Sequence, residues 1–388
     1  MTLLRFAVFF SLVSLIVSGS TYYLLKKRLG LSIKGNRYLI SMHVFSCILM
    51  IIAPLHYRVN HASLDSTPNF VMQFLQYYLM GWIGVTLISF GAAEVLQFIF
   101  KKFDPSKRIF LTEGVAKGLL ATTSIASFGG FIQLSRGPKV ERVTINLPSL
   151  PLSFDGITIA QLSDVHIGPL LNKNFAAEIV SITMELKADL IALTGDFVDG
   201  TIDQLKDHVL PFQNLKAEHG VYYITGNHEY YSGADEWLSH FENFGIHSLR
   251  NSNKVLEKTN SFGKNEKLLI GGVFDLQGER FSPEHRSDPV KAAYSTESVD
   301  CKILLAHNPR SIEAATQAGF HLQLSGHTHA GQFYPFTWIA RLAHQYFEGH
   351  YQVNEKTQIY VNRGTGFWGP PNRLGKTGEI TLITLKSV

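Results

Sequence analysis

The first third of the chain is dominated by long apolar runs that almost lack charged residues. Residues 6–25, 38–57 and 118–135 contain no Asp, Glu, Lys or Arg, and residues 70–100 contain only Glu94. About 20 consecutive apolar residues in a helix are enough to span a bilayer. The pattern therefore predicts an N-terminal all-α transmembrane bundle of about four helices, at about 3–25, 38–57, 72–100 and 116–135.

The first run raises the alternative of a cleaved signal peptide. One basic residue, Arg5, precedes it, and no clear small-x-small cleavage site comes before the next basic cluster. Because further apolar runs follow, a retained helix is favoured. Two ionisable residues, His43 and Glu94, lie inside the predicted spans, but each is solitary, which favours structural or interfacial roles.

The basic residues between these runs predict their orientation. Five Lys and Arg separate the first two predicted spans and four separate the last two, whereas the second and third are separated only by Arg58. The positive-inside rule places both basic loops in the cytoplasm. A multi-pass protein of the cell membrane with four spans then has both termini, and everything after residue 136, on the extracytoplasmic side. One stretch agrees, because it resembles a twin-arginine export signal with lysine in the first arginine position: SKRIFLTEGVAKGLLATTSIAS, from Ser106.

Beyond residue 136 short apolar runs alternate with amphipathic stretches, which is the pattern of an α/β domain. We therefore expect two domains, a transmembrane domain at 1–136 and an α/β domain at 137–388. Five of the apolar runs are followed within a few residues by Asp, Asn or His. In open α/β sheets ligands bind beyond the carboxyl ends of the strands. The five runs with their polar sequels are GITIAQLSDVHIG, ADLIALTGDFVDG, GVYYITGNHEYY, CKILLAHNP and FHLQLSGHTHAGQ.

The polar residues after these five strands form a candidate metal site. In the last of them, His-x-His in an extended segment would place both rings on the same side. A set of Asp, Asn and His without a thiolate suits Mn, Fe or Zn better than calcium, which prefers oxygen ligands alone. Two divalent ions bridged by one carboxylate would use all the candidates, whereas one ion would not. The polar residues at these strand ends are Asp164, His166, Asp196, Asp199, Asn227, His228, Glu229, His307, His327 and His329.

Charge and cysteine content argue against nucleic-acid binding and against cysteine-based sites. Residues 1–136 hold 13 Lys and Arg against 4 Asp and Glu, whereas the rest of the chain holds 22 against 27. After residue 136 no basic run is interleaved with aromatic residues, so nucleic acid is not expected as a partner. The two cysteines, Cys47 and Cys301, cannot build a disulfide framework or a thiolate zinc site.

The five blocks resemble those of the calcineurin-like metallophosphoesterases. The resemblance covers about 155–330 closely and extends more loosely over 140–388, and it implies a two-layer mixed β-sandwich flanked by helices. It assigns one ion to Asp164, His166 and His329, and the other to Asn227, His307 and His327, with Asp196 as the bridge. The blocks stand here as Asp164-x-His166, Gly195-Asp196-x-x-Asp199, Gly226-Asn227-His228-Glu229, His307 and Gly326-His327-x-His329.

Two features distinguish this chain from other branches of the family and narrow the range of candidate substrates. The protein-phosphatase branch has arginine after its second block, where this chain has Gly200. The stretches HAGQFYP and NRGTGFWGPPNR instead resemble the exported or membrane-bound bacterial branch. By analogy with that group, the candidate substrates include lipid-linked phosphates or pyrophosphates and nucleotide phosphates.

The resemblance implies a membrane-anchored, binuclear metal-dependent phosphoester hydrolase. A hydroxide shared by the two ions would attack phosphorus in line. His228 would donate a proton to the leaving group and Asp199 would orient it, unless Asp199 is instead a helix N-cap. Asn227, Arg363 and Arg373 are candidates for substrate contact, although the two arginines could equally pair with carboxylates. Glu229 is interpreted as a helix-start residue.

Two rival functions stay open. One is a catalytically silent membrane receptor or scaffold that uses the fold for binding, and the other is a transporter with a regulatory domain. An intact set of ligand and acid residues argues against the first, and the scarcity of charge in the spans argues against the second. An aromatic stretch after the last block, residues 333–351, is predicted either to form an apolar lip for a lipid tail or to pack against the sheet.

Overall fold

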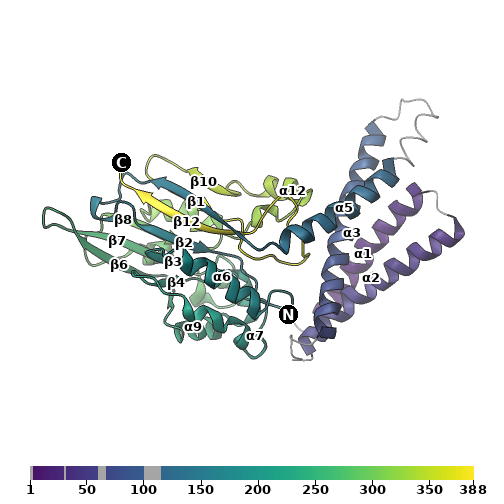
Figure 1. Ribbon diagram of the computed structural model, residues 1–388, viewed down its shortest axis with the longest axis horizontal. Helices are drawn as coiled ribbons and strands as arrows, with labels where there is room; N and C mark the ends of the chain where they lie inside the picture. Colours follow the sequence, from purple (N-terminus) through teal and green to yellow (C-terminus); the bar gives the residue numbers. More distant parts are fainter. Residues whose placement is uncertain (1–2, 30–31, 60–66, 100–114) are drawn as a thin grey trace. The chain divides into compact units, whose positions relative to one another are not determined.

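The computed structural model describes residues 3–29, 32–59, 67–99 and 115–388 (Figure 1). The four expected cytoplasmic cations between the third and fourth spans, at positions 101, 102, 107 and 108, lie outside the described residues, as does the start of the export-like stretch. The chain divides into two compact units. Unit 1 comprises Met1–Arg136 with Phe333–Phe336 and Gly369–Gly375, and unit 2 comprises Gly137–Gln332, Thr337–Trp368 and Lys376–Val388.

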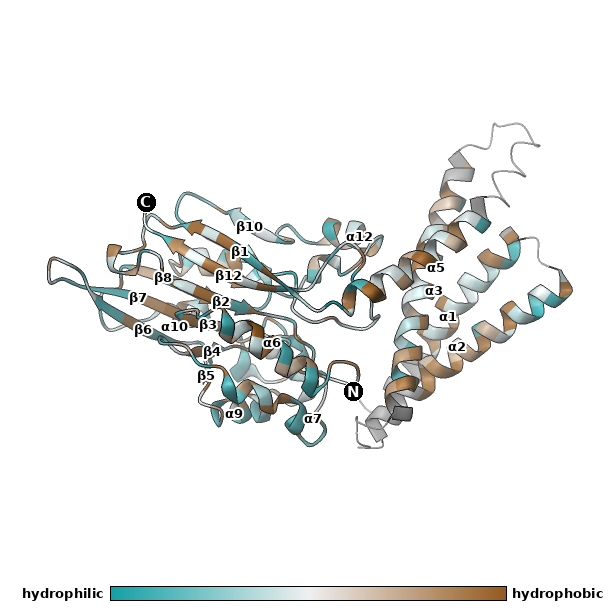
Figure 2. Ribbon diagram, in the orientation of Figure 1, coloured by the Kyte–Doolittle hydropathy of each residue, from teal (hydrophilic) through white to brown (hydrophobic). Residues whose placement is uncertain are grey.

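The first unit is built of helices. In the described part of the chain these are α1 (Leu3–Leu29), α2 (Ile33–Val59), α3 (Thr67–Ile99) and α5 (Val115–Leu134). Two of them contain stretches long and apolar enough to cross a membrane, Ile33–Ile52 in α2 and Phe70–Val95 in α3. Hydrophobic residues recur along both helices (Figure 2). Length and hydropathy therefore support two of the four expected spans.

Polar contacts inside unit 1 provide partners for the two ionisable residues of the predicted spans, His43 and Glu94. The Glu94 carboxylate pairs with Lys27 Nζ at 3.0 Å, and His43 Nδ1 lies 2.9 Å from the backbone carbonyl of Leu39. Leu25 and Phe90 are buried together in a small apolar cluster. Each ionisable group thus has a partner within the helical unit, as a structural role requires.

Unit 2 contains two six-stranded mixed sheets. In order across the first sheet, the strands are β1 (Lys139–Asn146), β12 (Glu379–Lys386), β2 (Thr158–Leu162), β3 (Leu190–Leu193), β4 (Val221–Tyr223) and β5 (His247–Ser248). In the second they are β10 (Gly349–Gln352), β11 (Gln358–Val361), β9 (Leu322–Ser325), β8 (Cys301–Leu305), β7 (Asn265–Gly272) and β6 (Ser252–Thr259). The expected α/β domain with two mixed sheets is confirmed.

Helices cover the sheets on their outer faces, with α6, α7 and α9 beside the first sheet (Figure 1). The α-helices of unit 2 are α6 (Lys173–Glu185), α7 (Ile202–Val209), α8 (Asn227–Ser232), α9 (Ala234–Glu242), α10 (Pro289–Ala293), α11 (Ile312–Gln317) and α12 (Phe336–Ala343). The short 3₁₀ helices are η2 (Leu152–Phe154), η3 (Leu210–Asn214), η4 (Gly278–Arg280), η5 (Pro283–His285), η6 (Pro309–Ser311) and η7 (His329–Gly331).

Strand β8 shows how the sequence produces this layering. Side chains alternate between the two faces of a strand. Ile303 and Leu305 therefore enter the core between the sheets, while Leu304 packs in a second cluster with residues of α10 and α11. All three side chains are fully buried. Each such Leu or Ile contributes about 1.5–3 kcal/mol relative to an exposed position.

The five predicted ligand-bearing strands are β2, β3, β4, β8 and β9. The first three are parallel neighbours in one sheet, and the last two are parallel neighbours in the other. Their carboxyl ends therefore lie at one edge of each sheet. Beyond the strand ends the loops remain hydrogen bonded, since the backbone N–H of Asp164 donates to the carbonyl of Gly195 (3.0 Å) and that of His166 to the carbonyl of Asp196 (3.1 Å).

We predict that Leu305→Ala lowers the free energy of unfolding of the protein by about 2–5 kcal/mol, because it leaves a cavity between the sheets. The matched control is Leu152→Ala at a side chain that is 70% exposed, which should change it by less than about 0.5 kcal/mol. Thermal unfolding of both variants in detergent checks this. Equal shifts in melting temperature would contradict the assignment of Leu305 to the core.

Candidate metal centre

The structure brings the seven candidate ligands, apart from the amide of Asn227, into three overlapping groups of His and Asp. Within each group the potential ligand atoms all lie within 4.8 Å of one another. The residues come from loops after five strands of two sheets, and most are buried. The groups are Asp164, His166 and His329; His166, Asp196 and His228; and Asp196, His307 and His327.

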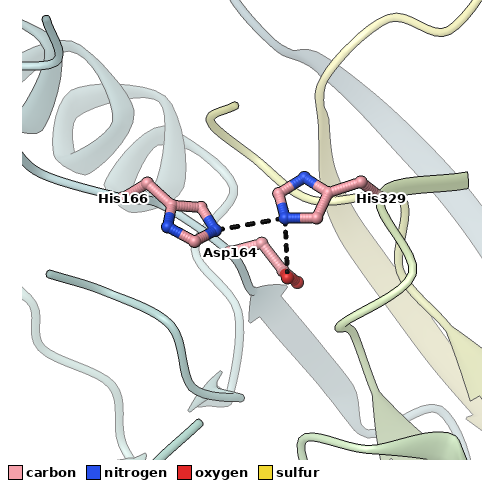
Figure 3. Close-up of side chains that lie close together, drawn as sticks. All are labelled: Asp164, His166 and His329. Atoms are coloured by element: carbon pink, nitrogen blue, oxygen red, sulfur yellow. Dashed lines mark hydrogen bonds and ion pairs between the residues drawn. The ribbon is translucent and has the colours of Figure 1, made fainter. Parts of the chain in front are cut away.

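The first group joins the loop after β2 to the loop after β9 (Figure 3). His329 Nε2 lies 3.2 Å from Asp164 Oδ1 and 3.1 Å from His166 Nε2. Ligand atoms around one zinc-like ion, each about 2.0–2.1 Å from it, lie about 3.3 Å apart in a tetrahedral site. The two facing imidazole nitrogens therefore have the spacing of ligands that share a cation.

The Asp164 carboxylate is held in place by the backbone. It accepts the N–H of His327 at 3.0 and 3.1 Å from its two oxygens. Burial opposes its charged form, but His329, followed by His307 and His166, holds the pKa of Asp164 well below its usual range. The group therefore remains an anion, as a metal ligand must be.

The third group, together with Asn227, offers buried polar atoms that suit a cation. His307 Nδ1 lies 2.8 Å from the carbonyl of Thr194, so that nitrogen carries the proton, and Nε2 lies 3.0 Å from Asp196 Oδ2. With Nδ1 protonated, the lone pair of His307 Nε2 faces the Asp196 carboxylate, and among the described residues Asn227 Oδ1 has no hydrogen-bond partner. A buried polar atom left unpaired costs free energy. A cation at this position would remove that cost, so the residues present fit a divalent ion.

The Asp196 carboxylate belongs to both the second and the third group. Its Oδ1 accepts the backbone N–H of His228 at 2.8 Å, while Oδ2 faces His307. Burial opposes ionisation, but His307 and His228 hold the pKa of Asp196 well below its usual range. A single anionic side chain is thus common to two clusters of potential ligands.

His228 and Asp199 form a pair at the edge of these groups. His228 Nδ1 lies 2.6 Å from Asp199 Oδ1, which also lies 3.1 Å from His166 Nδ1. Burial disfavours the charged imidazole, but Asp196 and Asp199 raise the pKa of His228 to about 9. The alternative of a helix cap does not hold for Asp199, because the N-cap of α7 is Thr201.

Glu229 is a residue whose role the sequence interpretation missed. Its fully buried carboxylate accepts the backbone N–H of Gly226 (2.6 Å), Asp196 (3.0 Å) and Phe197 (2.7 Å). It does lie in the first turn of α8, as predicted, but it also ties the loop after β3 to the loop after β4. Burial, together with Asp196, raises its pKa, and the amide donors oppose this rise. A glutamate inside the Gly-Asn-His block was the only available signal.

Left-handed backbone brings the ligands together. Five of them have positive φ, namely Asp164 (52°), His166 (54°), Asp196 (56°), His327 (71°) and His329 (49°). Such conformations are costly for residues with a Cβ and cluster at functional sites. The prediction that His327 and His329 lie on one side of an extended segment is wrong. Both are left-handed, Thr328 between them is helical, and the 3₁₀ helix η7 begins at His329.

Glycine is required where two loops approach. A Cβ on Gly226 would lie 2.2 Å from Asp196 Oδ1, and one on Gly326 would lie 2.2 Å from Asp164 Oδ2. Any side chain at either position would displace a carboxylate of the site. The glycines in the third and fifth blocks therefore serve close approach of backbone to ligand.

The two arginines proposed for phosphate contact are placed differently from the ligands. The guanidinium of Arg363 pairs with Glu141 at 2.7 Å and with Glu379 at 2.9 Å. Arg373 belongs to unit 1, where it is buried and its backbone N–H donates to the carbonyl of Gly130 at 3.2 Å. Arg363 would have to exchange a carboxylate for a phosphate in order to bind substrate.

Comparisons with known proteins identify the family. The profile of the family described as calcineurin-like phosphoesterase matches residues 157–331. A protein of Danio rerio named "Transmembrane protein with metallophosphoesterase domain" is 32% identical over 355 residues, which cover 87% of this chain and 79% of that protein. The chain belongs to the calcineurin-like phosphoesterase family.

Other members of this family extend the similarity. An uncharacterized metallophosphoesterase of Helicobacter pylori is 34% identical, covering 73% of each chain, and one of Campylobacter jejuni is 25% identical, covering 97% of this chain and 98% of the other. Among solved structures, a calcineurin-like phosphoesterase of Bacillus subtilis aligns with 58% of this chain and 81% of its own, at 17% identity and a TM-score of 0.34.

Membership establishes the class of the protein. It is an enzyme of the metallophosphoesterase type, its substrate is a phosphate ester, and the fold implies divalent metal ions at the Asp and His groups. Relatives occur in an animal as well as in bacteria. The name of the Danio rerio relative and the two apolar helices together indicate that the phosphoesterase associates with a membrane.

We predict that Glu229→Ala lowers the free energy of unfolding by about 2–4 kcal/mol, because three buried N–H groups lose their acceptor. It should also weaken metal binding, since the loops that carry Asp196 and Asn227 lose the carboxylate that ties their backbones together. Glu242→Gln is the control, because that carboxylate is 42% exposed and pairs with Arg250, which is worth at most about 1 kcal/mol. Thermal unfolding and elemental analysis test this, and an unchanged melting temperature would contradict it.

Proposed function

We propose that this phosphoesterase is a membrane-anchored, binuclear metal-dependent hydrolase of phosphate esters. The observation that carries the proposal is the position of Asp196, which lies in two groups of potential ligands at once. One carboxylate shared between two groups is the arrangement that two neighbouring ions require. The mixed imidazole and carboxylate set favours Mn, Fe or Zn.

In this proposal Asp164, His166 and His329 hold one ion. Asn227, His307 and His327 hold the other, and Asp196 bridges the two. When bound, the two ions supply a water of lowered pKa as nucleophile and positive charge for the phosphate oxygens. The orphaned oxygen of Asn227 supports its assignment, because an amide oxygen buried without a donor is suited to a cation.

His228 is the proposed proton donor to the leaving oxygen. Its Nδ1 is engaged by Asp199 at 2.6 Å, which leaves Nε2 free to face a substrate. The same contact fixes the orientation of the ring, so Asp199 is proposed as a positioning residue. General acid catalysis of this kind requires that the donor be protonated and reach the leaving oxygen in the bound state.

The substrate class that we favour is a lipid-linked phosphate or pyrophosphate. Helix α12, which follows the last metal block, supports it, since its large side chains Trp338 (65%), Ile339 (48%) and Leu342 (91%) are exposed. Other aromatic residues of the stretch 333–351 do pack on the domain, since Phe347 is buried and Tyr346 and Tyr351 lie against the cluster that contains Leu304. Asn227, Arg363 and Arg373 stay predicted substrate contacts.

For the membrane unit we propose four spans with the catalytic domain on the extracytoplasmic side. The support is the distribution of Lys and Arg, with five between the first two apolar runs and one between the next two. The receptor or scaffold alternative is less favoured, because a binding module has no need for buried carboxylates and imidazoles arranged in three potential ligand groups.

We predict that the purified full-length protein, loaded with manganese, binds two ions per chain and hydrolyses a chromogenic phosphodiester. Asp196→Asn should bind fewer ions and lower turnover by at least about 100-fold, since the shared ligand loses its charge. Elemental analysis and absorbance assays measure the two effects. Stoichiometric metal binding without any turnover would favour the scaffold alternative, and no metal binding would refute the proposal.

His228→Ala is predicted to retain both ions but to lower kcat for an alkyl phosphate ester by about 100- to 10,000-fold. The loss should be much smaller for p-nitrophenyl esters, because a good leaving group needs little protonation. Asp199→Asn should show the same dependence on the leaving group with a smaller amplitude. A uniform loss across leaving groups would show that His228 acts in binding and not as the acid.

The orientation of the membrane unit can be tested with reporters fused after Val388. Alkaline phosphatase should be active there and green fluorescent protein should be dark, because only the first matures outside the cytoplasm. Fusions after Asn36, within the first basic loop, should give the opposite result. A fluorescent fusion after Val388 would reverse the proposed side of the catalytic domain.

A further inference from the structure

Three large aromatic side chains stand exposed around His228. The centroid of the imidazole lies 5.5 Å from the ring of Tyr231 and 5.6 Å from that of Trp368, at interplanar angles of 72° and 75°. Phe281 packs against Tyr231 at 5.8 Å. More than half of the surface of each of these three residues is open to solvent, at 54%, 53% and 53% respectively.

Hydrogen bonds hold the Trp368 backbone and the Tyr231 hydroxyl in position. The backbone N–H and carbonyl of Trp368 both bond to the side-chain amide of Gln332, at 2.9 and 3.0 Å. Gln332 is buried and follows His329 by three residues, so it ties Trp368 to the loop of the metal histidines. The hydroxyl of Tyr231 donates to Gln277 at 2.8 Å. The backbone of Trp368 and the ring of Tyr231 are thus anchored, while about half of each residue remains exposed.

Exposed apolar surface gathered at one place on a folded domain marks a binding site more often than chance packing does. Here the exposed rings lie around His228, which the proposed function places beside the leaving oxygen. A group attached to that oxygen would therefore lie on the side of the site where Tyr231 and Trp368 border His228. The phosphate end, by contrast, faces the charged ligand groups.

We propose that Tyr231 and Trp368, with Phe281 behind Tyr231, form a leaving-group subsite for an apolar substituent on the phosphate ester. The inference rests on the proposed function, because His228 defines which side of the site the leaving group occupies. The shared chemistry is an apolar group one or two bonds from the scissile oxygen. Its source is either an aromatic ring or the hydrocarbon chain of a lipid.

The kinetic test uses ethyl, benzyl and octyl phosphate, each as the monoester and as its methyl diester. All three leave as primary alkoxides, so differences in kcat/KM report contacts with the substituent more than leaving-group basicity. We expect benzyl or octyl to exceed ethyl by about tenfold or more. A preference for benzyl over octyl identifies an aromatic source, and the reverse identifies a lipid chain.

The variants Tyr231→Ala and Trp368→Ala should each reduce this preference by about fivefold or more. Tyr231→Phe and Trp368→Phe should retain most of it, because they keep a ring at each position. The matched control is Tyr294→Ala, an aromatic residue that is 70% exposed after α10, and it should leave the preference as in the wild type. Thermal unfolding of each variant confirms that it is folded.

A binding measurement separates this inference from the proposed function. Calorimetric titration of the manganese-loaded protein with benzylphosphonate and ethylphosphonate, which are not hydrolysed, should show tighter binding of benzylphosphonate, and Trp368→Ala should abolish the difference. That result without turnover of any ester would refute the hydrolase and leave only an apolar binding site at Tyr231 and Trp368. Turnover of all three esters with equal kcat/KM, unaltered in the alanine variants, would overturn the subsite and leave the hydrolase standing.

Discussion

The pairing of buried carboxylates with buried imidazoles is the interaction on which the rest of this structure depends. The buried Asp164 and Asp196 and the partly buried Asp199 are each held as anions by neighbouring histidines, against the cost of leaving water. Removing one member of such a set leaves an uncompensated buried charge, which is far more costly than losing an exposed ion pair. The sandwich must therefore deliver all of these groups to the same place or leave the edge of its sheets electrostatically unsatisfied.

Bringing these groups together requires left-handed backbone conformations, which are uncommon for residues other than glycine. The ligands stand on loops in which left-handed residues follow directly from strand ends, and glycines at 226 and 326 admit the carboxylates of neighbouring loops. Glu229 stabilises this arrangement from behind by accepting three amide N–H groups from two different loops. The strained loops depend on the rigid strands beneath them, because residues stay in such conformations only when the surrounding structure holds them there.

The surroundings of the site divide its chemistry into two sides. Charged ligand groups suit the phosphate, whereas the exposed rings of Tyr231 and Trp368 border His228. Exposed apolar residues also occur on α12, in a chain that associates with a membrane. An apolar leaving group and a membrane location are compatible, because a substrate with a hydrocarbon part would concentrate where the enzyme is held.

Much of this organisation could be predicted from local pattern alone. Apolar runs predicted the helical unit, and short apolar strands followed by Asp, Asn or His predicted the five loops and the candidate ligands, because each signal lies within one short consecutive stretch of the sequence. Tertiary structure alone decided that three of those strands join one sheet and two the other, and that the His-x-His segment turns. It also decided that Glu229 links two loops. The pairing of Arg363 with Glu141 and Glu379 likewise depends on the tertiary structure. Trp368 reaches His228 from 140 positions away. Such contacts depend on how distant segments pack, and no periodicity along the chain records that.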